Sequence, residues 1–445
     1  MPRAAVFACM TLASAAVACN KIPTEVTFYK DVLPVLQKNC QGCHRPGEAA
    51  PMPFLSYKEV RPWAKAMKEV VLSRRMPPWF ADPRVGRFTN DRSLSKAEME
   101  TIVNWADSGA REGDLKDAPA PRQFAEGWLI SKPDVVFEMP AEYEVPASGT
   151  IEYTYYIVPT NFTEDHWVQM AETRPGNRGV VHHIIVFVRD AKSKWLREYP
   201  VGQAFVEVGE GEGHASGEIL TGFVPGVPPL MLGPGQAKLI KAGSDIVFQM
   251  HYTPNGKAAK DRSKLGILFA KEPPRQRVVM LSVVNTMFVI PPGAPAHSVN
   301  GAITLHGESE LILLQPHMHL RGKSMEMRAV YPSGEVEKLL WVPNYDFNWQ
   351  LWYQLPRGKV LPKGTRIEAT GTFDNSPKNK NNPDPTSAVR WGNQNWDEMM
   401  IGFFEVAIDV KMSPMDLIRA PKKQAPPPRR ISSIRSRSAD PAEGV

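Results

Sequence analysis

The stretch VVHHIIVFV, residues 180–188, is a run of β-branched and aromatic residues that surrounds two adjacent histidines. Such side chains favour β-strands. Comparable runs recur between Gly- and Pro-containing turns: Ile151–Val158, Gly179–Val188, Asp245–Tyr252, Val278–Phe288, Ser309–Leu314, Met325–Tyr331 and Met400–Val410. This spacing is typical of antiparallel β-sandwiches. The length of the strand-rich part of the chain predicts two of them, of the jelly-roll kind, over residues 130–275 and 276–412.

The N-terminal part of the chain has a different pattern. Val60, Met67 and Val71 recur at helical spacing, and Ser95-Lys96-Ala97-Glu98 is a capping box that begins a second amphipathic helix. We therefore expect a multidomain chain, in which a small all-α domain over residues 24–113 and a linker over residues 114–129 precede the two sandwiches.

Cys40-Gln41-Gly42-Cys43-His44 matches the attachment pattern of a c-type haem. Two thiols three positions apart can each bond a haem vinyl group, and the adjacent His44 then ligates the iron. The alternative is a two-cysteine redox or zinc site, but zinc needs further ligands that this segment lacks. The all-α domain is therefore expected to be a cytochrome c that carries heme c.

The sixth iron ligand should be a methionine, because this segment holds no second histidine. Met67 and Met99 lie in the expected helices, where core packing accounts for them. Met76 follows a helix and precedes Pro77 and Pro78, which end the helix and stiffen an extended loop. We expect Met76 to be the ligand, with Met52 as the alternative.

Five histidines stand in or beside the expected strands. His182 and His183 are adjacent, His251 ends a strand, and His317 and His319 flank Met318. An H-x-H pair on a strand places both imidazoles on one face, whereas adjacent histidines share a face only where the strand bulges. The grouping predicts metal binding, and imidazole suits zinc, copper, iron and nickel alike.

These segments resemble the copper type II, ascorbate-dependent monooxygenases, the family of peptidylglycine α-hydroxylating and dopamine β-monooxygenases. The resemblance covers most of residues 150–410, including an Asn-rich loop at residues 372–383 and the Asp-Glu-Met stretch at residues 397–399. In that family each of two sandwiches binds one copper ion. The resemblance implies two sets of copper ligands here: His182, His183 and His251 for one ion, and His317, His319 and Met399 for the other.

The chain also departs from the family. Met400 competes with Met399 for the ligand role, and strand alternation allows only one of them to face the metal. Gln315 stands where the peptide-hydroxylating branch has a substrate-binding Arg, and Phe403 stands where it has a Tyr. Because of these two replacements, a peptide carboxylate is not the expected substrate. The family's disulfides are not expected either, because Cys40 and Cys43 would hold haem.

The resemblance implies a copper-dependent monooxygenase, an oxidoreductase that acts on paired donors and incorporates molecular oxygen. It would hydroxylate a C–H bond of a small organic substrate at the ion held by His317, His319 and Met399. The fusion to a cytochrome suggests that an external donor reduces the haem, which feeds the copper ion at His182, His183 and His251. The alternatives are a non-catalytic electron carrier and a copper-binding or redox-sensing protein.

Both ends of the chain suggest processing or disorder. Residues 1–19 resemble a signal peptide with a small-residue cleavage site, and Cys19 is placed as the lipidated residue of a bacterial lipoprotein would be. We expect an exported protein, periplasmic or tethered to the outer membrane. The net charge of +6 arises largely in the tail over residues 413–445, which is expected to be disordered, so no nucleic-acid partner is expected.

Overall fold

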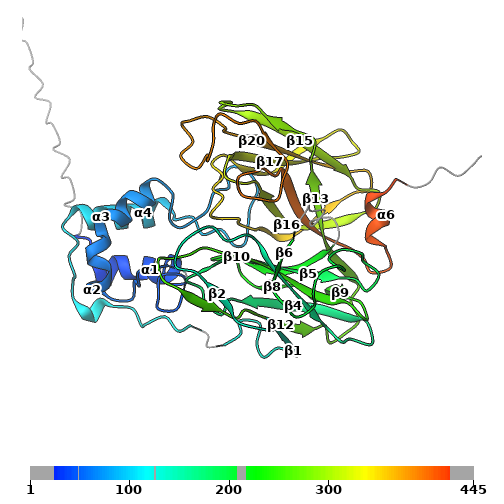
Figure 1. Ribbon diagram of the computed structural model, residues 1–445. Helices are drawn as coiled ribbons and strands as arrows, with labels where there is room; N and C mark the ends of the chain where they lie inside the picture. Colours follow the sequence, from blue (N-terminus) through cyan, green and yellow to red (C-terminus); the bar gives the residue numbers. More distant parts are fainter. Residues whose placement is uncertain (1–24, 49, 125–126, 208–216, 421–445) are drawn as a thin grey trace, which may run out of the picture.

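The computed structural model describes residues 25–48, 50–124, 127–207 and 217–420. The expected signal segment, the lipidation site at Cys19 and residues 421–445 of the basic tail lie outside these residues. Two bodies of β-sheet are stacked on each other, and a smaller helical body lies beside them (Figure 1). Among the described residues, no helix is both long and apolar enough to cross a membrane.

The first sandwich packs a five-stranded sheet against one half of a nine-stranded sheet. The five-stranded sheet has the order β6 (Phe205–Val206), β3 (Thr154–Pro159), β10 (Asp245–Tyr252), β5 (Val181–Arg189) and β7 (Glu218–Phe223). The facing half contains β1 (Val135–Glu138), β12 (Lys264–Phe269), β4 (His166–Arg174), β8 (Leu230–Met231) and β9 (Gln236–Ile240). Alternate residues of both sheets, among them Ile184, Phe248 and Ile267, fill the core between them.

The second sandwich is built on the other half of the same nine-stranded sheet. This half contains β13 (Gln276–Val284), β22 (Ile401–Asp409), β16 (Ser309–His317) and β19 (Tyr353–Leu361). The facing sheet has the order β15 (His297–Thr304), β20 (Arg366–Phe373), β17 (Gly322–Val330) and β18 (Val336–Val342). Small sheets pair β2 (Tyr143–Val145) with β11 (Ala259–Asp261) and β14 (Val289–Ile290) with β21 (Val389–Arg390).

The two sandwiches are joined at a seam inside the nine-stranded sheet. A short parallel pairing of β9 with β13 connects the two halves. Beside it, the buried Lys238 on β9 forms an ion pair with the buried Glu405 on β22 and donates hydrogen bonds to the carbonyls of Ile219 and Leu220. Because an unpaired charge is costly in a protein interior, this pair fixes how the sandwiches meet.

The N-terminal helices are α1 (Leu33–Asn39), α2 (Tyr57–Val60), α3 (Ala64–Leu72) and α4 (Lys96–Asp107), and α6 (Pro414–Ile418) follows β22. We call residues 28–107 without residues 77–94 the helical region. Its core contains Phe28, Leu36, Met67 and Trp105. The capping box at Ser95 and Glu98 is present at the start of α4.

The expected fold class, an all-α cytochrome c domain followed by two sandwiches, is wrong. The molecule is mostly β-sheet, with 36% strand and 13% helix, and in the described residues no all-α cytochrome c domain is evident. The helices are few and short, and residues 77–94 between α3 and α4, which we call the strap, leave the helices. Pro77 and Pro78 prevent a helix there, and Trp79 and Ala81 are buried in the core of the second sandwich. The several β-sheets agree with the sandwich part of the expectation.

Candidate metal centre

A β-bulge brings the first three histidines together. In the antiparallel pairing of β5 with β10, His251 lies opposite His183 but Tyr252 lies opposite Val181, so His182 is the extra residue. His183 and His251 therefore keep the face of Ile185 and Val247, and the bulge turns His182 towards them. One nitrogen from each of the three imidazoles lies within 4.8 Å of the others.

The three rings are held in a form that can ligate a metal. His183 and His251 are buried, and His182 is half-buried. Burial, followed by the charges of His182 and His319, lowers the pKa of His251 to about 3. Burial and the neighbouring histidines also lower the pKa of His183 well below its usual value. Neutral imidazole is the ligating form. Within the described chain Nδ1 of His251 is buried without a hydrogen-bond partner, as expected of an atom that awaits a metal.

The second pair of histidines lies at the end of strand β16, with His317 as its last residue and His319 just beyond it. Met318 is fully buried in the second sandwich, so His317 and His319 face away from that core. Nδ1 of His317 lies 2.8 Å from Oε1 of Gln350, and Nδ1 of His319 lies 3.3 Å from the carbonyl oxygen of Asp397. These acceptors favour a proton on Nδ1, which leaves the Nε2 lone pair for a metal.

Met399 and Met400, which directly precede strand β22, point to opposite sides of the chain. Met400 lies in the core of the second sandwich, beside Met318 and across from Gly371. Met399 is packed on the other face with Ile401 and Phe403. Since Ile401 lies opposite His317 in the strand register, Met399 is on the face that carries the two histidines. Among the two methionines, Met399 is thus the one placed for a thioether ligand.

A buried network supports the second pair. Glu398 is fully buried and accepts hydrogen bonds from the backbone N–H groups of His319, at 2.8 Å, and Arg321, at 2.5 Å. Nε of Arg321 donates to Asn375, whose amide donates in turn to the carbonyls of Pro291 and Ser387. Burial raises the pKa of Glu398 to about 8, although these backbone donors oppose it. Through Asn375, the Asn-rich loop therefore helps to position the His317–Arg321 segment.

Both ligand sets face one interface between the sandwiches. Tyr155, Phe187 and Val247 from the five-stranded sheet pack there against Ile401 and Phe403. The Phe347 ring lies between the sets, with its centroid 6.2 Å from His182 and 5.9 Å from His319. In Figure 1 this is where β5 and β10 of the lower body approach β16 of the upper body.

Sequence reasoning missed three residues of the site. Tyr345, Phe347 and Gln350 all lie on the loop between β18 and β19. The hydroxyl of Tyr345 bonds both the N–H and the carbonyl of Met318, at 3.2 and 2.8 Å. A polar, aromatic loop has no periodicity that relates it to a distant strand, so no sequence signal could have identified it.

The residues expected to attach haem, Cys40, Cys43 and His44, follow directly after α1. Cys40 and Cys43 are free thiols, and Nδ1 of His44 lies 3.1 Å from the carbonyl oxygen of Met52. That acceptor fixes the imidazole, which also stacks on Phe54 with ring centroids 4.2 Å apart. Nε2 of His44 is then the nitrogen that could ligate an iron. The three residues fit a c-type haem, because two unpaired thiols and an oriented imidazole are what that attachment requires.

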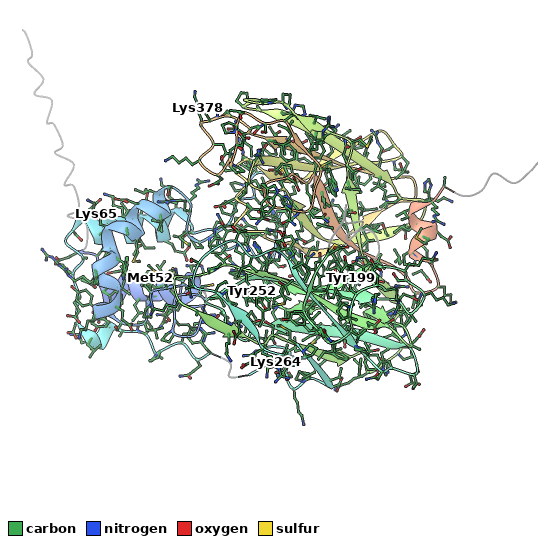
Figure 2. All side chains as sticks on the ribbon, viewed as in Figure 1. Met52, Lys65, Tyr199, Tyr252, Lys264 and Lys378 are labelled. Atoms are coloured by element: carbon green, nitrogen blue, oxygen red, sulfur yellow. The ribbon has the colours of Figure 1, made fainter. Side chains whose placement is uncertain are left out.

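The contact between His44 and Met52 also distinguishes the two candidates for the sixth ligand. Met52, labelled in the helical region in Figure 2, places its backbone beside Nδ1 of His44, on the side of the ring opposite Nε2. Met76 lies at the end of α3, half-buried, on a cavity of about 150 Å³ that Met99 and Trp79 also line. Met67 is buried in the helical core, as expected. The contact with His44 therefore argues against Met52, and Met76 stays the predicted ligand.

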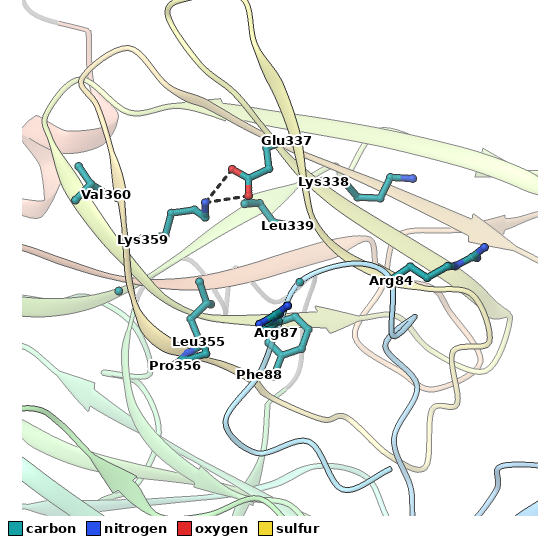
Figure 3. A pocket seen from close by; sticks show the side chains of 12 residues that line it. Arg84, Arg87, Phe88, Glu337, Lys338, Leu339, Leu355, Pro356, Lys359 and Val360 are labelled. Atoms are coloured by element: carbon teal, nitrogen blue, oxygen red, sulfur yellow. Dashed lines mark hydrogen bonds and ion pairs between the residues drawn. The ribbon is translucent and has the colours of Figure 1, made fainter. Parts of the chain in front are cut away.

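A wider cavity lies away from all of these residues. It measures about 880 Å³ and lies between the strap and strands β18 and β19 (Figure 3). Three of its cations are neutralised by ion pairs: Arg84 with Asp82, Lys338 with Glu326, and Lys359 with Glu337. The net charge of the cavity therefore comes chiefly from Arg87, which also lines it.

Comparisons with known proteins add no identity to this geometry. No protein-family model and no curated protein matches the chain. Among solved structures, infectious bursal disease virus, Gx strain, is similar at 8% identity over 67% of this chain and 77% of that chain, with a TM-score of 0.17. The oxalate decarboxylase of Bacillus subtilis is similar at 7% identity over 63% of this chain and 80% of that chain, with a TM-score of 0.13. Likenesses this remote bear on neither the fold nor the function of the protein.

Proposed function

We propose that the protein is an exported, haem- and copper-containing oxidoreductase, an O2-dependent monooxygenase that hydroxylates a C–H bond of a small organic substrate. The observation that carries the proposal is the convergence of His182, His183 and His251 on one interface with His317 and His319. Three neutral imidazoles on one side, and two imidazoles with a thioether on the other, are donor sets that suit copper.

When bound, the haem would supply one-electron transfer and copper would supply oxygen activation. The chain's own residues do the rest. Gln350 and the carbonyl of Asp397 hold the imidazoles of His317 and His319 in the tautomer that ligates through Nε2. Phe347 and Phe403, with ring centroids 5.9 Å from His319 and 6.1 Å from His317, keep water from the second set.

The surroundings of the second set favour an uncharged substrate. Gln315 and Phe403 lie opposite each other in the pairing of β16 with β22, on the face of His317. Gln315 is buried and carries no charge that could bind a carboxylate. An aromatic and amide-lined surface of this kind suits a small apolar or weakly polar molecule.

The test is substrate-dependent oxygen uptake by the copper-loaded, chemically reduced protein, screened over small organic compounds. We expect His317→Ala to abolish the uptake while the absorption spectrum of attached haem stays unchanged. His297→Ala, a histidine of β15 outside both sets, serves as the matched control and should keep full uptake.

Equal uptake by the His317→Ala variant would contradict the monooxygenase proposal. If no compound triggers uptake while an added electron acceptor still oxidises the haem rapidly, the protein is an electron carrier. If copper binds without either activity, it is a copper-binding or sensing protein.

A further inference from the structure

The strap is an integral part of the second sandwich. The N–H of Asp82 donates to the carbonyl of Trp341, and the N–H of Thr89 donates to the carbonyl of Gln354, both at 2.8 Å. Asn90 forms two further bonds, from its amide to the carbonyl of Trp352 at 2.6 Å and from the N–H of Gln354 to its side-chain oxygen at 3.0 Å. The strap thus follows the edge of the sandwich over most of its length.

Trp79 is the anchor of the strap. It is 8% exposed, and its ring packs edge-on against Tyr353 at the start of β19, with centroids 4.9 Å apart. Phe88 completes the aromatic cluster, 5.9 Å from Trp79 and 5.4 Å from Tyr353. A buried tryptophan held by two aromatic neighbours has little freedom to move.

Only Pro77 and Pro78 separate this anchor from Met76. Proline fixes φ and restricts the residue before it, so the Met76–Trp79 segment is a stiff connector. At its other end, Met76 is held by backbone hydrogen bonds of Arg75 and Met76 to the carbonyl of Val70. The backbone position of Met76 is therefore determined from two sides, by α3 and by the core of the second sandwich.

We propose that the second sandwich completes the haem site, with Trp79 as the positioning residue that holds Met76 as the axial thioether ligand. This inference rests on the proposed function only in requiring that haem is attached at Cys40 and Cys43. The haem iron would then have both axial ligands only in the assembled molecule. A thioether ligand raises the reduction potential of a haem. Packing of the strap against the second sandwich would therefore set the reduction potential of this haem.

The strap also reaches the loop that serves the second ligand set. Trp352, whose carbonyl accepts from Asn90, lies two residues after Gln350, the hydrogen-bond partner of His317. Tyr353, against which Trp79 packs, follows directly. One segment therefore connects Met76 with the loop that orients His317.

The experiment uses the full-length protein with haem attached and follows the haem itself. We expect the wild type to show the weak long-wavelength absorption band of a thioether-ligated ferric haem and to bind carbon monoxide slowly when reduced. Trp79→Ala should lose the band, bind carbon monoxide several-fold faster and have a lower reduction potential. Trp79→Phe, which keeps an aromatic ring, should restore the band. Trp63→Ala, a 41% exposed tryptophan of the helical region, is the matched control and should behave as wild type.

Near-ultraviolet circular dichroism reports whether the second sandwich stays folded. If Trp79→Ala unfolds it, Asn90→Ala decides, because that variant removes two strap bonds far from Met76 and should speed carbon monoxide binding by a smaller factor. The inference would be overturned if a folded Trp79→Ala protein kept the absorption band and still bound carbon monoxide slowly. Where Trp79→Ala does not fold, the same result in Asn90→Ala would overturn it. Absence of covalent haem from the wild type would instead contradict the proposed function.

Discussion

The two candidate ligand sets reach similar donor arrangements by different means. His182, His183 and His251 are brought together by the backbone alone, through a bulge between two paired strands of one sheet. His317 and His319 stand at the end of a strand, and side chains from other segments, chiefly Gln350 and Glu398, hold them. The first set is therefore as rigid as the sheet itself, whereas the second depends on hydrogen bonds contributed by distant parts of the chain.

The largest expected effect breaks the first set. His251→Ala removes one of three convergent imidazoles, and no carboxylate or thiol of the described residues takes its place in that cluster. Loss of a ligand should weaken copper binding at this set by more than the roughly 10–100-fold that loss of a supporting residue costs. Competition with a chelator of known affinity measures it. His166→Ala, on strand β4 of the same sandwich, should leave the affinity unchanged; a loss there of similar size would show that general destabilisation explains the result.

A smaller effect tests whether the second set depends on its supports. Gln350→Ala leaves both imidazoles in place but removes the acceptor 2.8 Å from Nδ1 of His317. We expect copper affinity at the second set to fall by roughly 10–100-fold, and that at the first set to stay constant. Gln276→Ala, at the seam of the nine-stranded sheet, is the control. Equal affinity in Gln350→Ala and wild type would mean that the strand end is already rigid and that the contrast between the sets is wrong.

The sequence predicted the parts of this comparison that depend on local pattern. Strand periodicity places His317 and His319 on one face and separates Met399 from Met400, and the chain adopts both arrangements. From the sequence, a bulge at His182 could be stated only as a condition for His182 and His183 to share a metal. The strand pairing that creates the bulge joins segments some 70 residues apart. Nothing local encodes that pairing.

Two features that the sequence did not predict have a common physical cause. The strap was taken as a loop of the helical domain, since Pro77 and Pro78 mark only where a helix ends. Its position is set by burial of Trp79 and Ala81 in a core whose other members begin at Val279, about two hundred residues further along the chain. The joining of both sandwiches in one nine-stranded sheet is likewise a long-range contact, centred on Lys238 and Glu405.

The smallest expected effect concerns the helical region and should leave both ligand sets unchanged. Burial raises the pKa of Glu98, but hydrogen bonds from Lys38, Ser95 and Asn39 outweigh it and lower the pKa to about 2. A carboxyl with a depressed pKa stabilises the fold above its unfolded pKa of about 4.3, and this contribution is lost as the pH falls towards 2. Because the Lys38 side chain is 70% exposed, water screens the pair, and the contribution at neutral pH should be about 1 kcal/mol.

At pH 7, the helical region should therefore have a lower free energy of unfolding in Glu98→Gln than in wild type. Near pH 2 the two free energies should be equal. Denaturant titrations followed by the absorption of attached haem, at a series of pH values, measure the difference. Glu100→Gln changes an exposed carboxylate on the same helix and should show no such dependence. A difference between Glu98→Gln and wild type that stayed constant from pH 7 to pH 2 would mean that Glu98 acts through packing alone. The acid response of the haem-attachment segment would then have to come from other carboxylates.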